Sequence, residues 1–362
     1  MTETLITPAD AARTAGDVLL EVEDLAVEFR SDGGAVRAVD GLSYRVEAGR
    51  TLALVGESGC GKSVSSLAVM GLLPPTARVV GGTARYRGTD LLALSPTKHR
   101  AHCGTHVAMV FQDALAALNP VHTVGYQLTE SLRARTGASR REARRRAVEL
   151  LDLVKVPNAA QRVDEYPHQF SGGMRQRVMI ASALALDPDV LIADEPTTAL
   201  DVTVQAQVLR LLAEIQAERQ MGLVLITHDL GVVAGVADDV TVMYAGRAVE
   251  HAPVRDLYAA PAHPYTRALL RSVPRIDVVD EHAGGRLPVV PGRPPAPGSA
   301  PSGCSFHPRC DVARTGASGA VPAGEGAVRD VCRTVEPPLD DVAPGRSSAC
   351  HFAAELLGGA RA

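Results

Sequence analysis

A glycine-rich segment at residues 56–63 constrains the fold more than any other part of this chain. It reads Gly-Glu-Ser-Gly-Cys-Gly-Lys-Ser and fits the spacing G-x-x-x-x-G-K-S. The apolar run 51–55 before it predicts a buried strand, and residues 65–73 after it predict a helix that ends at two prolines. In such a strand–loop–helix unit, backbone N–H groups and the helix N-terminus attract phosphate. The segment therefore predicts a nucleoside triphosphate site in an α/β domain.

Every residue of this loop is a candidate nucleotide contact. The lysine is predicted to neutralise the β- and γ-phosphates, and the final serine to ligate Mg²⁺. The cysteine lies near a helix N-terminus, where a thiolate is favoured, so a redox switch is one interpretation and a variable loop position is the other. The predicted contacts are Gly56, Glu57, Ser58, Gly59, Cys60, Gly61, Lys62 and Ser63.

An acidic pair follows a second apolar run, Val190–Ala193. Asp194 ends this predicted strand, a position that aims its carboxylate at the Mg²⁺ shell. Glu195, the next residue, is the better candidate for the base that orients an attacking water. A simple capping turn before the helix that follows Pro196 is the alternative interpretation.

Length and composition limit the class of protein. At 362 residues, with 46% hydrophobic residues, the chain can hold one large α/β domain and a smaller appendage. The net charge of −4 gives no electrostatic footprint for nucleic acid. The basic run 139–146 is interpreted as a solvated helix face, because acidic residues interleave its arginines. No secretory signal and no apolar stretch of about 18 residues is present, so we expect a cytoplasmic chain.

Three regions follow from the pattern along the chain. Residues 1–17 are expected to be a disordered polar tail. Between residues 18 and 262, strands alternate with helices, which predicts a mostly parallel sheet covered by helices, with a helical part at about 114–187. From residue 263 to 362 the composition shifts to proline and glycine, and we expect a separate, loop-rich C-terminal appendage.

Five motifs occur in one order: the glycine-rich loop, Gln112, the segment 171–176, the acidic pair and His228. Together they resemble the ATP-binding subunit of an ABC transporter. Residues 18–352 resemble the branch of that family that powers peptide import. The resemblance implies a parallel sheet core, an antiparallel β-subdomain and a helical subdomain. It also implies ATP and Mg²⁺ as cofactors, with ATP hydrolysis as the activity.

The resemblance also assigns roles to residues outside the loop. Gln112 is expected to touch Mg²⁺, and His228 to contact the γ-phosphate, although a single histidine after a strand is usually structural. Phe29 is a candidate for stacking on adenine or equally a core residue. In this family two nucleotide domains dimerise head to tail, and the signature loop of each caps the ATP of the other. The residues implied for this second contact are Ser171, Gly172, Gly173, Gln176 and Asp201.

The implied partners are two transmembrane permease subunits, a second ATP-binding subunit, identical or related, and indirectly an extracytoplasmic solute-binding protein. Nucleic acid is not expected, and the chain would sit at the cytoplasmic face of the membrane. The expected cargo is a dipeptide or oligopeptide. Nickel or another small solute is the alternative with the same mechanism. A soluble ABC ATPase acting on nucleic acid or ribosomes is an alternative of another class.

Four of the six cysteines crowd into the C-terminal appendage. Structural disulfides are not expected in the cytosol, so these four suggest a ligand set. The surrounding segments resemble the tail of oligopeptide and dipeptide importer ATPases, some of which carry an iron–sulfur cluster. A [4Fe–4S] cluster, a Zn²⁺ ion and four unligated thiols are the three alternatives. The stretch 311–331 is longer than that family's spacing. The candidate ligands are Cys304, Cys310, Cys332 and Cys350.

Overall fold

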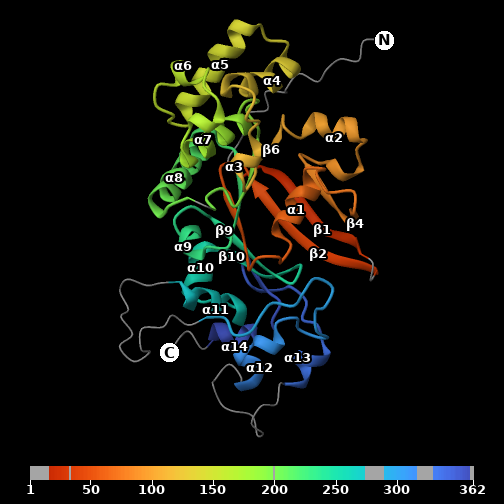
Figure 1. The fold of residues 1–362 in the computed structure, drawn as a ribbon. Coiled ribbons are helices and arrows are strands. Elements are labelled where there is room, and N and C mark those ends of the chain that lie inside the picture. The colour runs from red at the N-terminus through yellow and green to blue at the C-terminus, as the bar shows by residue number, and fades with distance from the viewer. Residues whose placement is uncertain (1–15, 32–33, 199, 274–288, 316–328, 359–362) are drawn as a thin grey trace.

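The computed structural model describes residues 16–31, 34–198, 200–273, 289–315 and 329–358 (Figure 1). Helices gather at one end of the molecule, two sheets form the middle and the C-terminal residues form the other end (Figure 1). The predicted N-terminal tail lies almost wholly outside the described residues, and so does most of the long stretch between Cys310 and Cys332. Among the described residues, every helix is too short or too polar to cross a membrane.

The central sheet has eight strands in the order β11-β12-β10-β9-β3-β8-β7-β6. The pairs β9–β3, β3–β8, β8–β7 and β7–β6 are parallel, as predicted from the alternation of strands and helices. Strands β3, β6, β7 and β8 are buried along their whole length, as expected for a sheet covered on both faces. The strands are β3 (Thr51–Val55), β6 (Val107–Val110), β7 (Val190–Asp194), β8 (Gly222–Thr227), β9 (Asp239–Tyr244), β10 (Arg247–Pro253), β11 (Asp340–Ala343) and β12 (Arg346–Ser348).

A second sheet is antiparallel and has the order β2-β1-β4-β5. Its strands alternate buried and exposed side chains, because one face packs on a core shared with the central sheet and the other faces water. The helix after the glycine-rich loop packs in the same core and starts earlier than residue 65, the predicted beginning. These elements are β1 (Val18–Ser31), β2 (Gly34–Glu47), β4 (Ala77–Tyr86), β5 (Thr89–Asp90), α1 (Lys62–Val69), η1 (Leu91–Ala93) and α2 (Pro96–His102).

The helical end of the molecule comes mainly from residues 114–183 (Figure 1). In the arginine-rich α5, Ser139 and Glu142 form a capping box, and Ala143, Ala147 and Leu150 face the core. Its arginines pair with acidic neighbours on the outside, as the solvated-face interpretation predicts. The helices here are α3 (Ala114–Ala117), α4 (Val124–Thr136), α5 (Arg140–Leu153), α6 (Ala159–Arg162), η2 (Pro167–Gln169), α7 (Gly172–Ala183) and α8 (Val202–Arg219).

As its composition predicts, the C-terminal region is rich in loops, and it packs against the central sheet. Strand β12 pairs with β10, and β11 pairs with β12, so both strands extend the central sheet. Phe306 and Cys310 share one apolar core with Val55 and Tyr244 of the central sheet. These apolar residues follow no helical or strand period, so pattern analysis missed them. The remaining helices are α9 (Leu230–Val233), α10 (Val254–Ala259), α11 (Pro264–Ser272), η3 (His307–Arg309), α12 (Asp311–Thr315), α13 (Asp330–Thr334) and α14 (Ala353–Gly358).

Candidate functional site

The glycine-rich loop lies between the end of β3 and the start of α1, and its glycines are sterically required. A Cβ at Gly56 would stand 2.2 Å from the carbonyl oxygen of Met243 in β9. At Gly61, where φ is 103°, a Cβ would stand 2.6 Å from the carbonyl oxygen of Ala38 in β2. The loop therefore threads between two strands where only glycine fits.

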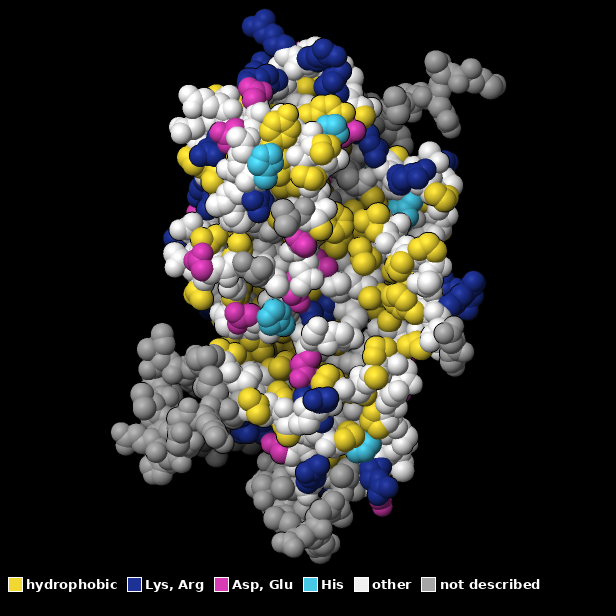
Figure 2. All heavy atoms as spheres, viewed as in Figure 1, with side chains coloured by type: hydrophobic (Ala, Val, Ile, Leu, Met, Phe, Trp, Pro, Cys, Tyr) yellow, Lys and Arg dark blue, Asp and Glu magenta, His cyan; other side chains and the backbone are white. Residues whose placement is uncertain are grey.

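A cavity of about 930 Å³ opens over this loop. Phe29 and Val36 line one side from the antiparallel sheet, and Glu195 and His228 line another from the central sheet. Acidic side chains gather near the middle of the face shown in Figure 2. Phe29 is half-buried and also packs against the core beneath it, so its two predicted roles are compatible. Of the predicted loop contacts, all but Cys60 line the cavity.

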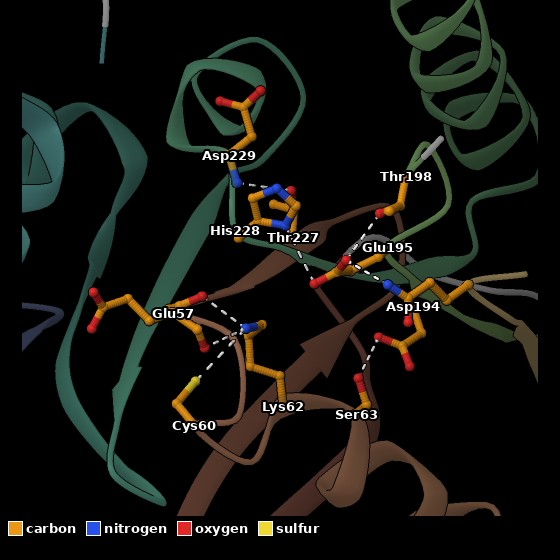
Figure 3. A network of polar contacts seen from close by, with 12 residues as sticks. Glu57, Cys60, Lys62, Ser63, Asp194, Glu195, Thr198, Thr227, His228 and Asp229 are labelled. Carbon is orange, nitrogen blue, oxygen red and sulfur yellow. Dashed lines mark hydrogen bonds and ion pairs between the residues drawn. The ribbon is translucent and has the colours of Figure 1, made fainter. Parts of the chain in front are cut away.

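Lys62 is buried at the base of the loop, with 4% of its surface exposed. Its ammonium donates to the carbonyl oxygens of Gly56 at 2.7 Å and Glu57 at 3.0 Å (Figure 3). The loop carbonyls thus hold a positive charge at the cavity. Cys60 Sγ lies 3.7 Å from the same ammonium, yet burial raises the pKa of this thiol. The expectation of a favoured thiolate at Cys60 is therefore wrong, because desolvation outweighs the nearby cation.

Ser63 and Asp194 meet beside the loop. The Ser63 hydroxyl donates to Asp194 Oδ1 at 2.9 Å, although the two residues are 131 positions apart in the sequence (Figure 3). Asp194 is 5% exposed, and burial raises the pKa of its carboxyl group against the opposing effect of that hydrogen bond. A hydroxyl and a buried carboxylate side by side are the hard oxygen ligands that Mg²⁺ takes, so these residues fit that cation.

Glu195 lies at the junction of three elements. Its Oε2 accepts from Gln112 Nε2 and from the Thr198 hydroxyl, each at 2.9 Å, and its Oε1 lies 3.3 Å from His228 Nδ1 (Figure 3). Its φ is 43°, in the left-handed region, so the chain reverses directly after β7. The structure therefore brings Gln112, Glu195 and His228 together at the rim of the cavity. Such a conformation at a non-glycine residue is common at active sites.

The segment 171–176 lies elsewhere. Ser171 caps α7, with its hydroxyl accepting from the Met174 N–H at 3.4 Å, and Gly173 packs on α8, where a Cβ would stand 2.6 Å from Val204. Asp201 caps α8 and accepts from the N–H groups of residues 203 and 204. None of the described residues that line the cavity belongs to this set, which includes Ser171, Gly172, Gly173, Gln176 and Asp201.

The four C-terminal cysteines lie near one another. The Cys304 N–H donates to the Cys332 carbonyl at 2.9 Å. Burial raises the pKa of Cys310, Cys332 and Cys350, and the charge of Cys304 adds to the rise in each case. Yet in the described part of the chain no group of three or more His, Cys, Asp or Glu side chains is arranged to hold a metal ion. The expected iron–sulfur cluster or zinc site is therefore not supported by the geometry.

Sequence analysis missed four residues of the C-terminal region that reach the nucleotide cavity or its loop. Leu269 and Pro297 line the cavity. Tyr265 accepts a hydrogen bond from the Glu57 N–H at 2.9 Å, and Arg309 forms an ion pair with the Glu57 carboxylate. These contacts join positions more than 200 residues apart, and no local pattern marks them.

The loop, its lysine and the acidic strand end define the chain as an α/β nucleotide-binding protein of the phosphate-loop class. Two family models match it: "ABC transporter" over residues 39–198, and "Oligopeptide/dipeptide transporter, C-terminal region" over residues 249–316. The dipeptide transport ATP-binding protein DppD of Escherichia coli is 46% identical over 92% of this chain and 96% of that protein. The oligopeptide transport ATP-binding protein OppD of Salmonella typhimurium is 46% identical over 96% of this chain and 98% of that protein.

Solved structures agree on the fold. The chain matches CbiO1 from Clostridium perfringens with a TM-score of 0.58 and 26% identity, over 67% of this chain and 91% of that one. It matches the dimeric bacterial cassette MJ0796 with a TM-score of 0.59 and 24% identity, over 66% and 99%. Together with the sequence relatives, these matches show that the chain belongs to the family of ABC transporter ATP-binding proteins.

Proposed function

We propose that this chain hydrolyses ATP at the cavity over residues 56–63 and thereby powers the import of dipeptides or oligopeptides through separate membrane subunits. The observation that supports the chemical part is that Lys62, Ser63 and Glu195 line one cavity, with Asp194 hydrogen-bonded to Ser63. The observation that supports peptides as the cargo is the similarity to DppD and OppD along more than nine-tenths of the chain.

The loop residues bind and orient the triphosphate. Lys62 exchanges its loop carbonyls for phosphate oxygens when ATP enters, and the N–H groups at the start of α1 donate to the phosphates. Ser63 and Asp194 would hold Mg²⁺, which supplies charge neutralisation on the transferred phosphate when bound. Phe29 and Pro297 also line the cavity, and we assign them contact with the base.

Glu195 orients the attacking water in this proposal. Its carboxylate is held by Gln112 and Thr198, so its position is set before the substrate binds. His228, on the loop after β8, is 58% exposed at its side chain and faces the same rim, where it can contact the γ-phosphate. Gln112 couples this carboxylate to the segment after β6. The segment that carries Gln112 contacts Glu195 at the cavity, so it is well placed to transmit the nucleotide state to a neighbouring subunit.

A second copy or a related ATP-binding subunit completes the site. The signature loop, residues 171–176, opens α7, whose N-terminus can attract an anion, yet it lies away from the cavity of its own chain. In a head-to-tail dimer, each such segment would cap the ATP on the opposite chain. The cassette MJ0796, whose fold this chain shares, is dimeric, which is compatible with a dimer here.

Reconstitution with the permease subunits and a solute-binding protein tests cargo and partners together. The genes flanking this one are the first place to look for those subunits. We expect dipeptides or oligopeptides, and not Ni²⁺, to stimulate ATP hydrolysis in proteoliposomes, with Glu195→Gln as the inactive control. The chain should sediment with membranes only when the permease subunits are present. Stimulation by Ni²⁺ alone would replace the peptide cargo, and tight binding to ribosomes or DNA at physiological salt would contradict the transport role.

We further propose the four C-terminal thiols as the ligands of a [4Fe–4S] cluster, with Zn²⁺ as the alternative. Two observations support this. Four cysteine thiolates are the usual ligands of such a cluster. The charge of Cys304 also raises the pKa of the other three thiols, as expected for cysteines that lie close together. Because their arrangement is not that of a formed metal site, side-chain rotation on binding is part of the proposal. The cluster takes no part in ATP hydrolysis in this scheme.

A further inference from the structure

The C-terminal region contacts the glycine-rich loop, residues 56–63, directly. Arg309 Nη1 and Nη2 donate to the two carboxylate oxygens of Glu57 at 2.6 and 2.8 Å. Glu57 is the second residue of the glycine-rich loop, and its carboxylate points away from the Lys62 ammonium (Figure 3). The side chain of Glu57 is therefore engaged with the C-terminal region, while its backbone carbonyl accepts from Lys62.

The Arg309 side chain makes further contacts with three residues besides Glu57. Its Nε donates to the Pro291 carbonyl at 2.7 Å, and Nη1 also reaches the Tyr244 hydroxyl at 3.4 Å. The guanidinium lies over the rings of Tyr244 and Phe306, 5.7 and 5.9 Å from their centroids. Only 5% of its side chain is exposed. A planar, buried and two-pronged pair of this kind fixes geometry far better than a surface pair.

A second contact holds the loop backbone at the same residue. The Glu57 N–H donates to the hydroxyl of Tyr265 in α11 at 2.9 Å. Tyr265 is fully buried and packs against Tyr244 and Phe306. Two C-terminal residues from separate elements, Tyr265 and Arg309, thus clamp the backbone and the side chain of one loop residue.

We propose that Arg309 is a positioning residue for nucleotide binding: through Glu57 it holds the phosphate loop in its binding conformation. The inference rests on the proposed nucleotide site. Its physical reason is preorganisation, because a loop already ordered pays less conformational entropy when the phosphates bind. Arg309 also lies in the turn between Cys304 and Cys310, so its side chain links the cysteine-bearing region to the glycine-rich loop.

The test measures the dissociation constant of the full-length chain for MgATP by titration calorimetry. Arg309→Met keeps the apolar stem and removes the charge, and we expect it to weaken binding by about fivefold or more, the usual range of coupling between sites. Arg309→Lys should recover part of the loss, since it restores one donor. The matched control is Arg267→Met, which removes the 3.3 Å ion pair between Arg267 and Asp311, two residues of the same region outside the glycine-rich loop.

Glu57→Gln breaks the same Arg309–Glu57 ion pair by changing the loop residue. The Glu57 side chain is 26% exposed, so this substitution does not disturb the apolar core. This variant becomes the main test if Arg309→Met yields too little folded protein. We expect Glu57→Gln to weaken MgATP binding as well. The double variant Glu57→Gln/Arg309→Met should bind MgATP no more weakly than the single variant with the lower affinity. Unchanged affinity in Arg309→Met, or an equal loss in Arg267→Met, would overturn the inference. Failure of the wild-type chain to bind MgATP would overturn the nucleotide site itself, and this inference with it.

Discussion

Gln112 Nε2 donates to Glu195 Oε2 at 2.9 Å, joining the second residue after β6 to the first residue after β7. The two strands are parallel neighbours, so their carboxyl ends meet at one edge of the sheet. This single contact places the proposed water-orienting carboxylate and the proposed Mg²⁺-contacting amide in one rigid unit before any nucleotide binds.

Replacing that carboxylate separates binding from chemistry. Glu195→Gln keeps the hydrogen-bonding shape and removes the negative charge, so ATP should still bind while turnover falls by about 10²–10⁴-fold. Size-exclusion chromatography with ATP should then show a trapped dimer. Lys62→Ala is the contrasting variant, because it should lose nucleotide affinity instead. Near-normal hydrolysis by Glu195→Gln in the assembled transporter would remove Glu195 from this role.

Ser63 should set the Mg²⁺ requirement of the site. Ser63→Ala removes the hydroxyl that lies 2.9 Å from Asp194 Oδ1, and we expect the Mg²⁺ concentration for half-maximal ATP binding to rise by roughly tenfold or more. Ser65→Ala is the matched control, since that buried hydroxyl donates to the Lys62 carbonyl three residues earlier. A Mg²⁺ titration followed by nucleotide fluorescence distinguishes the two, and equal behaviour of the variants would argue against the assignment.

His263 should make the junction with the C-terminal region sensitive to acid. Its Nδ1 accepts from the Tyr265 N–H at 3.1 Å, and complete burial lowers the pKa of the imidazole to about 3. A histidine with a lowered pKa contributes stability above its unfolded value of about 6.5, and that stability is lost as the pH falls toward 3. The loss can reach about 1.4 kcal/mol per pH unit.

His263→Asn keeps an acceptor at this helix cap but cannot titrate there. Thermal midpoints measured between pH 7 and about 4 should therefore fall less steeply for the variant than for the wild type. Neighbouring Glu250 acts with the opposite sign, because burial raises the pKa of its carboxyl group, and the substitution leaves that contribution in place. Parallel curves for the two proteins would show that His263 does not control the acid response.

Metal analysis decides among the three interpretations of the C-terminal thiols. Purified without oxygen, the chain should be brown and contain about four irons, and Cys304→Ser should remove the colour. Cys103→Ser, in the nucleotide-binding part, is the control and should leave the iron in place. A colourless chain with one zinc ion would indicate a structural zinc site. A chain with neither metal would leave the four cysteines as packing residues.

Most of the nucleotide-binding fold could be predicted from local patterns. The apolar runs 51–55 and 190–193, predicted as buried strands, form β3 and most of β7 in the central sheet. Such signals are short-range, because a buried parallel strand needs only a few successive apolar residues. The glycine-rich loop, Gln112, Glu195 and His228 were named from motifs, and each follows a strand of the central sheet.

The sequence by itself determined the phosphate loop, the acidic strand end and the family, because glycine spacing and apolar runs are properties of neighbouring residues. Only the tertiary structure decided that the C-terminal region joins the central sheet and that Arg309 meets Glu57 across 252 positions. It also decided that burial opposes ionisation of Cys60. Desolvation and ion pairing depend on which distant residues pack together, and that information exists only once the chain has folded.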